Sequence, residues 1–269
     1  MERKKNVIAV MSPKGGVGKT SVTANLAAAF ALIYDKKVLA VDTNISTASL
    51  GLHFDIYFPQ HTIHDISKKD GAEKAIHVYH QNLHVLPASI KIRAEEKNIN
   101  KVRENLAKLI KNYENFLENV SKKYDLVLLD CAPGFDLESI AAMNIAGGLI
   151  VVTNPDYPSV VTAVKAIEYA RRSKMPVGGI IVNNIKNKKY ELHPNDIEKA
   201  LGIKVIGKIP YDKRIPESIM EKKPVVLFKA NSKSSKEFRR IAAGILGENP
   251  EQSWFKRYVQ KIKKNKNNK

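Results

Sequence analysis

The chain has 269 residues and an apolar content of 43%, which suffices for one sizeable core, while no apolar run is long enough to span a bilayer. A formal net charge of +18 predicts an anionic partner, either nucleic acid or a lipid surface. Cys131 is the only cysteine, which excludes an internal disulfide framework and favours a cytoplasmic location.

A glycine-rich segment near the N-terminus has the sequence Ser-Pro-Lys-Gly-Gly-Val-Gly-Lys-Thr over residues 12–20. The apolar run 6–11 before it predicts a buried strand, and residues 21–33 after it predict a helix. Glycines between a strand and a helix let backbone N–H groups approach phosphate oxygens, and the helix N-terminus adds partial positive charge. The pattern therefore predicts a phosphate-binding loop.

Two side chains of this loop are expected to have separate roles in binding a phosphate chain and its Mg²⁺. We expect Lys19 to reach the β and γ phosphates and the Thr20 hydroxyl to ligate Mg²⁺. Aligned from Pro13, the segment fits the usual phosphate-loop pattern except that proline replaces its first glycine. The residues predicted to bind the nucleotide here are Pro13, Lys14, Gly15, Gly16, Val17, Gly18, Lys19, Thr20 and Ser21.

The second lysine, Lys14, makes the loop resemble the deviant Walker A motif of the MinD/ParA family of P-loop ATPases, which includes the nitrogenase iron protein and arsenical-pump ATPases. The resemblance implies that Lys14 crosses a dimer interface and contacts the phosphates bound by the partner subunit. It also implies a homodimer that binds Mg·ATP between its two subunits. The likeness extends from Val7 to about Leu246 and is closest to the MinD subgroup.

The next predicted strand, residues 37–41, ends at Asp42 and leads into a segment that resembles switch I of the family. By this resemblance, Asp42 supports the water shell of Mg²⁺, and a second aspartate two residues later positions the attacking water. Asn44 stands at that second position. Because asparagine accepts a hydrogen bond but cannot take a proton, we expect either slow ATP hydrolysis or an ATP-binding switch with little turnover.

Residues 124–130 form an apolar run that ends in Asp130, the Walker B pattern, so Asp130 is predicted to hold Mg²⁺ through water. The following segment, 131–134, resembles switch II, which implies that the backbone N–H of Gly134 contacts the γ-phosphate. Iron–sulfur members of the family need two cysteines per chain, and this chain has one. We therefore interpret Cys131 as a small buried residue and not as a cluster ligand.

Three further apolar runs, 148–153, 177–182 and 204–209, predict strands, and residues 159–172 predict a helix. By resemblance, Asn183 at the end of the second run recognises adenine, with Asn184 as a second candidate. The same resemblance places Pro210 and Asp212 at the adenine pocket. An amide suits this role because it both donates to and accepts from the base edge.

The remaining elements complete an α/β pattern. Residues 83–88 predict a strand, 94–122 a helix and 234–246 a terminal helix closed by Gly247, whereas 53–82 reads as a mixed connection. About seven buried strands alternating with helices predict the three-layer P-loop NTPase fold, a mostly parallel twisted sheet with helices on both faces. We expect a nucleotide-binding domain over residues 1–247 and a basic tail over 248–269.

The tail carries seven Lys or Arg residues and no acid between positions 253 and 269. Treated as a helix, it separates an apolar arc from a basic arc, which is typical of a helix lying in a membrane interface. It also resembles the membrane-targeting helix of the MinD subgroup. A helix docked on its own domain and a contact with nucleic acid are the alternatives. The residues predicted to enter the membrane are Trp254, Phe255, Tyr258, Val259 and Ile262.

These features favour an ATP-dependent dimerising switch that docks on the inner face of the cell membrane and positions a cargo protein, such as division machinery, with a partner that stimulates hydrolysis. The alternative is a ParA-like partition ATPase that binds nucleic acid non-specifically, which the net charge of +18 favours. A metallocluster-carrier ATPase is disfavoured because paired cysteines are absent from the sequence.

Overall fold

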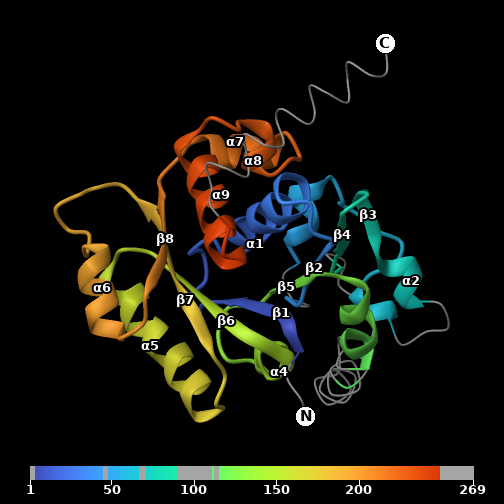
Figure 1. Cartoon of the computed structure of the whole chain (residues 1–269), viewed down its shortest axis with the longest axis horizontal. Coiled ribbons are helices and arrows are strands. Elements are labelled where there is room, and N and C mark those ends of the chain that lie inside the picture. The colour runs from blue at the N-terminus through green and yellow to red at the C-terminus, as the bar shows by residue number, and fades with distance from the viewer. Residues whose placement is uncertain (1–3, 45–47, 67–70, 90–110, 112–114, 249–269) are drawn as a thin grey trace, which may run out of the picture.

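The computed structural model describes residues 4–44, 48–66, 71–89, 111 and 115–248 (Figure 1). Within these residues an eight-stranded sheet has the order β3-β4-β2-β5-β1-β6-β7-β8. All neighbouring strands are parallel except β3 and β4. The strands are β1 (Lys4–Met11), β2 (Val38–Asp42), β3 (His77–His80), β4 (Leu83–Leu86), β5 (Leu126–Asp130), β6 (Ala146–Thr153), β7 (Val177–Ile185) and β8 (Val205–Pro210). The predicted fold class is confirmed.

Among the described strands, β3 is the one that the sequence did not predict. It has four residues, it pairs antiparallel to β4 at the edge of the sheet, and alternate side chains along it are exposed. Val78, for example, retains 68% of its accessible surface. A short, half-exposed edge strand has no continuous apolar run, and its sequence therefore resembles a connecting loop.

One face of the sheet is covered by α1 (Lys19–Ala28), its π-helical continuation η1 (Ala29–Ile33), α8 (Val225–Phe228) and α9 (Lys233–Leu246) (Figure 1). The 3-10 helix η2 (Leu50–Phe54) and α7 (Arg214–Met220) pack at the same face. As predicted, α9 ends at Gly247, whose positive φ of 67° suits a residue without a Cβ. Small alanines along α1 and η1 let the backbone of this helix lie close to the strands.

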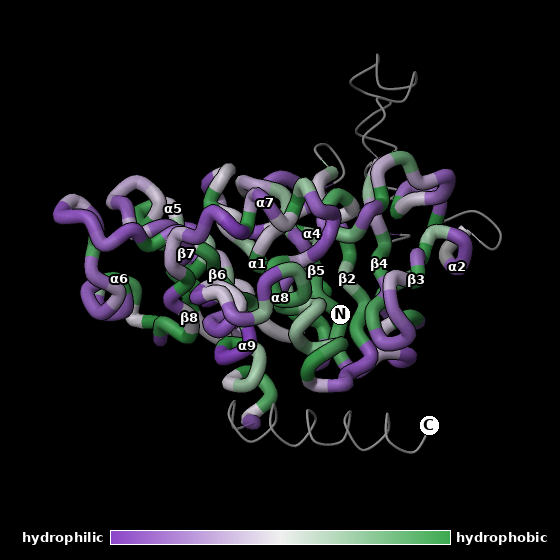
Figure 2. Tube along the Cα trace, turned by 90° about the horizontal axis from the view of Figure 1, so that it is seen from above, coloured by the Kyte–Doolittle hydropathy of each residue, from purple (hydrophilic) through white to green (hydrophobic). Residues whose placement is uncertain are grey.

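The opposite face is covered by α4 (Leu137–Ile145), α5 (Tyr157–Arg172) and α6 (Pro194–Leu201), together with the short α2 (Gly71–Ala75). Helical residues 115–120, which contribute Phe116 and Leu117 to the core, belong to the helix predicted over 94–122; most of that range lies outside the described residues. The 3-10 turns η3 (Ile63–Asp65) and η5 (Ser121–Lys123) complete the described elements. Figure 2 shows hydrophobic colour along β2, β4 and β5 and hydrophilic colour on the outer α6.

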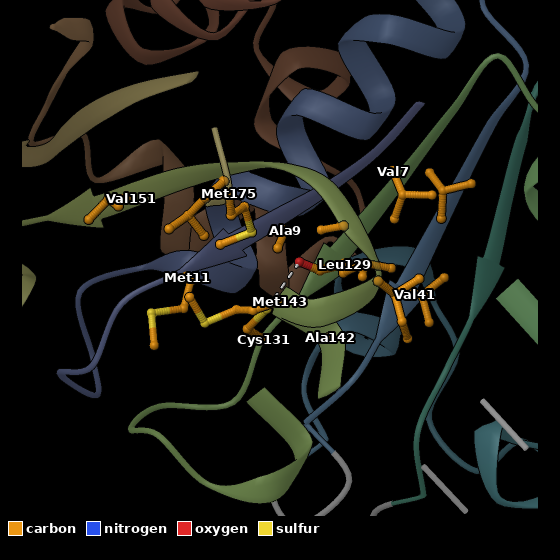
Figure 3. Packing of buried hydrophobic residues seen from close by; sticks show 14 of the residues in the cluster. Val7, Ala9, Met11, Val41, Leu129, Cys131, Ala142, Met143, Val151 and Met175 are labelled. Atoms are coloured by element: carbon orange, nitrogen blue, oxygen red, sulfur yellow. Dashed lines mark hydrogen bonds between the residues drawn. The ribbon is translucent and has the colours of Figure 1, made fainter. Parts of the chain in front are cut away.

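The sheet is apolar on both faces, so its strands are nearly continuous hydrophobic runs. Cys131 lies in one of these cores beside Met11 and Met143 (Figure 3). Its thiol donates to the carbonyl of Leu129 at 3.8 Å, and burial raises its pKa to about 12. The interpretation of Cys131 as a small buried residue is confirmed.

Candidate functional site

The predicted site residues converge at the carboxyl ends of the central strands. Strands β2 and β5 pair in a register that sets Asp42 directly beside Asp130. Strand β1 lies next to β5 and delivers the glycine-rich loop to the same edge, because Val10 pairs with Asp130. Ligands of open parallel sheets bind at this edge.

The glycine-rich loop has the backbone geometry of an anion-binding turn. Gly16 and Gly18 have φ values of 74° and 92°, which other residues rarely adopt. Gly18 is also the N-cap of α1, whose first turn contains no acidic side chain to compete for an anion. A Cβ added at Gly18 would collide with the side-chain amide of Asn183. The backbone angle therefore favours glycine here, and a larger residue would also displace the Asn183 amide.

Lys19 is enclosed by the loop that carries it, with only 7% of its surface exposed. Its Nζ donates to the carbonyl of Lys14 at 3.4 Å. Burial lowers the pKa of Lys19, and the nearby carboxylate of Asp130 partly opposes this effect. A buried ammonium beside a ring of backbone N–H groups is suited to a bound phosphate, which would supply the missing negative charge.

Asp42 and Asp130 are both buried. Asp42 accepts backbone N–H bonds from Asn44 at 3.1 Å and from Ser49 and Leu50 at 3.0 Å. Burial, followed by repulsion from Asp130, nevertheless raises the pKa of Asp42. Burial raises the pKa of Asp130 as well, although Thr20, Thr23 and Lys19 oppose it. Two desolvated carboxylates side by side therefore favour the uptake of a proton or a cation.

The residues present fit Mg²⁺. Asp130 Oδ1 accepts from the Thr23 hydroxyl at 3.1 Å, but Oδ2 is buried and has no hydrogen-bond partner among the described residues. At the start of α1, the Thr20 hydroxyl lies 3.0 Å from the hydroxyl of Ser49, which precedes η2. The described residues contain no cluster of three His, Cys, Asp or Glu side chains. A site with two carboxylates and a hydroxyl suits Mg²⁺, which retains waters and takes phosphate oxygens as further ligands.

Switch residues flank this centre. Asn44 is buried next to Asp42, and the preceding Thr43 donates its hydroxyl to the carbonyl of Asp130 at 2.9 Å. Gly134 has a φ of 93°, in the loop between β5 and α4, and a Cβ there would press on Asp136. The described parts of the segments that resemble switch I and switch II thus lie at the same edge of the sheet as the phosphate loop.

Lys14 points away from the interior of its own loop. Its Nζ lies 3.0 Å from Asp156 Oδ1 and 2.8 Å from the Ser159 hydroxyl, at the start of α5. Neither Asp156 nor Ser159 was predicted from the sequence to be a site residue. The spacing of Asp156 and Ser159 is typical of a helix N-cap and could be recognised in the sequence. Their contact with Lys14 could not, because it depends on the pairing of β1 with β6.

The candidates for adenine recognition lie at the ends of β7 and β8. Asn183 donates its Nδ2 to the carbonyl of Val17 at 2.8 Å, so one of its amide hydrogens already supports the phosphate loop. Asn184 has a φ of 62°. Asp212 accepts from the Ser234 hydroxyl at 2.7 Å and from the backbone of Arg214 at 3.0 Å. Asp212 is thus tied to α7 and α9, and Pro210 ends β8 beside it.

The basic tail from residue 249 on, including Trp254, Phe255, Tyr258, Val259 and Ile262, lies outside the described residues. Among the residues that the structure does describe, no helix has the length and apolar character needed to cross a membrane.

Comparisons with known proteins cover most of the chain. The profile of the ParA family, described as NUBPL iron-transfer P-loop NTPase, matches residues 3–246. An uncharacterized ATP-binding protein of Methanocaldococcus jannaschii is 32% identical over 89% of this chain and 87% of its own. The cell division ATPase MinD of Pyrococcus furiosus is 28% identical, with a TM-score of 0.80 and coverage of 91% and 99% of the two chains. MinD of Pyrococcus horikoshii, solved with Mg-ADP, is 28% identical, with a TM-score of 0.76 and coverage of 90% and 96%.

Proposed function

Because this chain belongs to the ParA family of P-loop NTPases, we propose that it is an ATP-dependent dimerising switch of the MinD type. Two copies bind Mg·ATP between them, and the nucleotide controls whether the dimer forms. The dimer docks on a membrane through its basic tails and positions a cargo protein. A partner protein stimulates hydrolysis and returns the chains to the free state.

The observation that carries this proposal is the difference between the two lysines of one phosphate loop. Lys19 is enclosed and faces the site of its own chain, whereas the side chain of Lys14 is 39% exposed and contacts the start of α5 instead. A partly exposed lysine at the rim of a phosphate site is accessible to a second copy. A symmetric dimer then brings each Lys14 to the nucleotide of the other subunit.

Within each subunit the chain's own residues divide the work. Lys19 and the loop N–H groups bind the phosphates, and Thr20, Asp42 and Asp130 hold Mg²⁺, which neutralises charge that develops on the transferred phosphoryl group. Asn183 or Asn184 recognises adenine, with Pro210 and Asp212 beside the base, and the N–H of Gly134 contacts the γ-phosphate. Asn44 orients the attacking water by accepting a hydrogen bond without removing its proton. The proposed enzyme is therefore a slow ATPase.

Membrane docking depends on the tail and on the dimer. A short amphipathic helix binds a lipid surface weakly, and linking two of them raises the overall affinity through a high effective concentration. Nucleotide-driven dimerisation thus determines how long the protein stays on the membrane. Removing residues 253–269 is expected to abolish ATP-dependent sedimentation with anionic liposomes. Unchanged sedimentation would contradict tail-mediated docking, while the dimerisation proposal would stand.

Dimerisation itself is tested by the mass of the particle in solution. The wild-type chain is expected to double its mass on addition of Mg²⁺ and a non-hydrolysable ATP analogue, but not with ADP. The Lys14→Ala variant is expected to bind the analogue and remain monomeric. A wild-type chain that stays monomeric with the analogue bound would exclude the switch.

A second candidate function, non-specific nucleic-acid binding, is favoured by a basic aromatic patch at the ends of β7 and β8. Tyr190 and Tyr211 are 74% and 59% exposed, and Lys186 Nζ lies 5.2 Å from the ring centroid of Tyr211. The carboxylate of Glu191 is directed to the backbone N–H of Lys186, at 3.0 Å. Exposed rings among lysines provide stacking surfaces and phosphate contacts. The lysines of this patch are Lys186, Lys188 and Lys189.

Reversing two of these charges, with Lys188→Glu and Lys189→Glu, separates the candidates. Loss of salt-sensitive binding to single-stranded DNA, with liposome sedimentation retained, would favour the nucleic-acid function. DNA binding that is absent in the wild-type chain, or unaffected by the charge reversal, would remove this second candidate.

A further inference from the structure

Two asparagines at the ends of neighbouring strands meet at the phosphate loop. Strands β6 and β7 are parallel and pair Thr153 with Val182, so the next residues along the two strands, Asn154 and Asn183, are neighbours. Both side chains lie against one acceptor, the main-chain carbonyl of Val17 in the loop. We call Asn154 and Asn183 the asparagine brace.

The amide nitrogens of the brace are the donors. Asn183 Nδ2 donates to the Val17 carbonyl at 2.8 Å. With its nitrogen facing the nearby carbonyls, the Asn154 amide donates to the Val17 carbonyl at 3.3 Å and to the Asn183 carbonyl at 3.2 Å. In the opposite orientation the Asn154 oxygen would face two acceptors and make neither bond. The Val17 carbonyl therefore accepts from both side chains, and Asn154 also holds the main chain of Asn183.

The direction of the Val17 carbonyl determines the direction of the Gly18 N–H. Both groups belong to one planar trans peptide unit, in which C=O and N–H point in opposite directions. The brace draws the carbonyl toward the ends of β6 and β7, so the Gly18 N–H is directed away from the brace. A loop that binds an anion needs this arrangement, with N–H groups turned toward the anion and carbonyls turned away from it.

The surroundings of this peptide unit hold it in place on both sides. The Val17 side chain is almost fully buried, in the core that α1 covers. Gly18 follows with a φ of 92°, which turns the chain directly into α1. Because Gly18 has no Cβ, the Asn183 amide can approach the loop closely. The brace is thus the polar contact that complements the apolar anchor of the loop.

We propose that Asn154 is a positioning residue which, together with Asn183, orients the peptide unit between Val17 and Gly18 for a bound phosphate chain. Without these donors the peptide unit is free to rotate, and its carbonyl then turns toward the phosphates and repels them. Asn183 therefore acts on the phosphates, whichever residue contacts the base. This inference rests on the proposed function in one respect, namely that the loop binds the phosphates of ATP.

The expected effect is that of single hydrogen bonds. Each amide gives the Val17 carbonyl one bond, and the loss of one such bond is expected to weaken phosphate binding by about 2- to 13-fold. The two losses are not independent, because both bonds share one acceptor. A variant that lacks both amides is therefore expected to lose less than the product of the two single losses.

The test uses inorganic tripolyphosphate with Mg²⁺, a probe that has phosphates and no base. Its affinity is measured by displacement of a fluorescent ATP analogue from the wild type, Asn154→Ala, Asn183→Ala and the double variant. Each single variant is expected to bind tripolyphosphate about 2- to 13-fold more weakly. Asn154→Gln keeps an amide and is expected to retain part of the affinity. Asn195→Ala, at an exposed asparagine of α6, is the matched control and is expected to bind as the wild type does.

The outcomes separate the brace from a role in base recognition. Unchanged tripolyphosphate affinity in Asn154→Ala or Asn183→Ala would overturn the brace, even if ATP binding falls, because the loss would then concern the base. A wild type that binds ATP but not tripolyphosphate would overturn it too, since the loop would then supply no affinity of its own. A double variant that loses the full product would show that the asparagines do not act through one carbonyl. A wild type that binds neither ligand would instead overturn the proposed function.

Discussion

The inner and outer halves of the nucleotide site differ in how they hold charge. In the inner half, Lys19, Asp42 and Asp130 are almost completely buried, and their pKa values are shifted toward the neutral forms. In the outer half, Lys14 and Asp156 form a partly exposed ion pair. The inner half is preorganised for Mg²⁺ and phosphate at a cost in stability, whereas the outer half is suited to exchange partners.

The largest expected effect separates the two lysines. Lys19→Ala is expected to weaken nucleotide binding by about 100-fold or more, because truncating one side of a buried charged contact costs about 3 kcal/mol. Lys14→Ala is expected to leave the affinity of the monomer within a few-fold of wild type. Titration with a fluorescent ATP analogue measures both. Equal losses would show that the two lysines serve one and the same site.

We expect the folded chain to become more stable when one charge of the Asp42–Asp130 pair is removed. Because the folded chain holds a proton on this pair more tightly than the unfolded chain, the free energy of unfolding falls as pH rises from the ordinary value of 3.8 through the raised pKa values. At pH 7.5 without Mg²⁺, Asp130→Asn is expected to stabilise the fold by about 1 to 2 kcal/mol. Urea denaturation measures this.

Mg²⁺ with nucleotide provides the matching control for the carboxylate pair. Mg²⁺ and nucleotide together are expected to raise the urea unfolding midpoint of the wild type substantially. The midpoint of Asp130→Asn is expected to rise little, because binding stabilises only a chain that has both carboxylates for Mg²⁺. A variant that is less stable than the wild type in both conditions would contradict the view that the pair is strained without a cation.

Asn44 tests how far the inner half limits turnover. Asn44→Asp is expected to raise the rate of ATP hydrolysis by about tenfold, because a carboxylate both orients the water and accepts its proton. The rate of phosphate release at saturating Mg·ATP measures the effect, with dimerisation checked in parallel. Equal rates would refute the role proposed for this position.

A smaller effect is expected from His53, which lies in η2, the turn that follows the Asp42 loop. Its Nδ1 has no hydrogen-bond partner among the described residues, and burial lowers its pKa to about 4. Since the unfolded chain takes up the proton first, stability is lost as pH falls below the ordinary value of 6.5. Between pH 7.5 and 5.5 the loss is about 1 kcal/mol. His53→Leu is expected to remove this part of the pH dependence of unfolding, and an unchanged profile would contradict it.

The sequence predicted the inner half well because its signals are local. A strand, a glycine-rich turn and a helix are contiguous over residues 6–33, and Asp42 and Asp130 each end an apolar run. Parallel strands place both aspartates at one edge of the sheet, and the observed pairing of β2 with β5 sets them side by side. Local patterns of this kind determine both the fold class and the phosphate site.

The outer half depends on contacts between segments that are far apart in the chain. Lys14 and Asp156 meet only because β1 and β6 are neighbours, and Asn183 bonds to Val17 only because β7 brings it to the phosphate loop. Helix α4 and strand β3 were not predicted either, since each is short and has no strong periodicity. Non-local pairing is the information that a single sequence does not display.

The central claim, that each subunit completes the site of the other, is tested most directly by mixing two inactive variants. Lys14→Ala retains the binding site and lacks the crossing lysine, whereas Lys19→Ala retains the crossing lysine and lacks the binding site. In an equal mixture, each dimer that combines the two variants contains one complete site, so hydrolysis well above the sum of the separate variants is expected to return. A mixture no more active than the sum of its separate components would contradict the account.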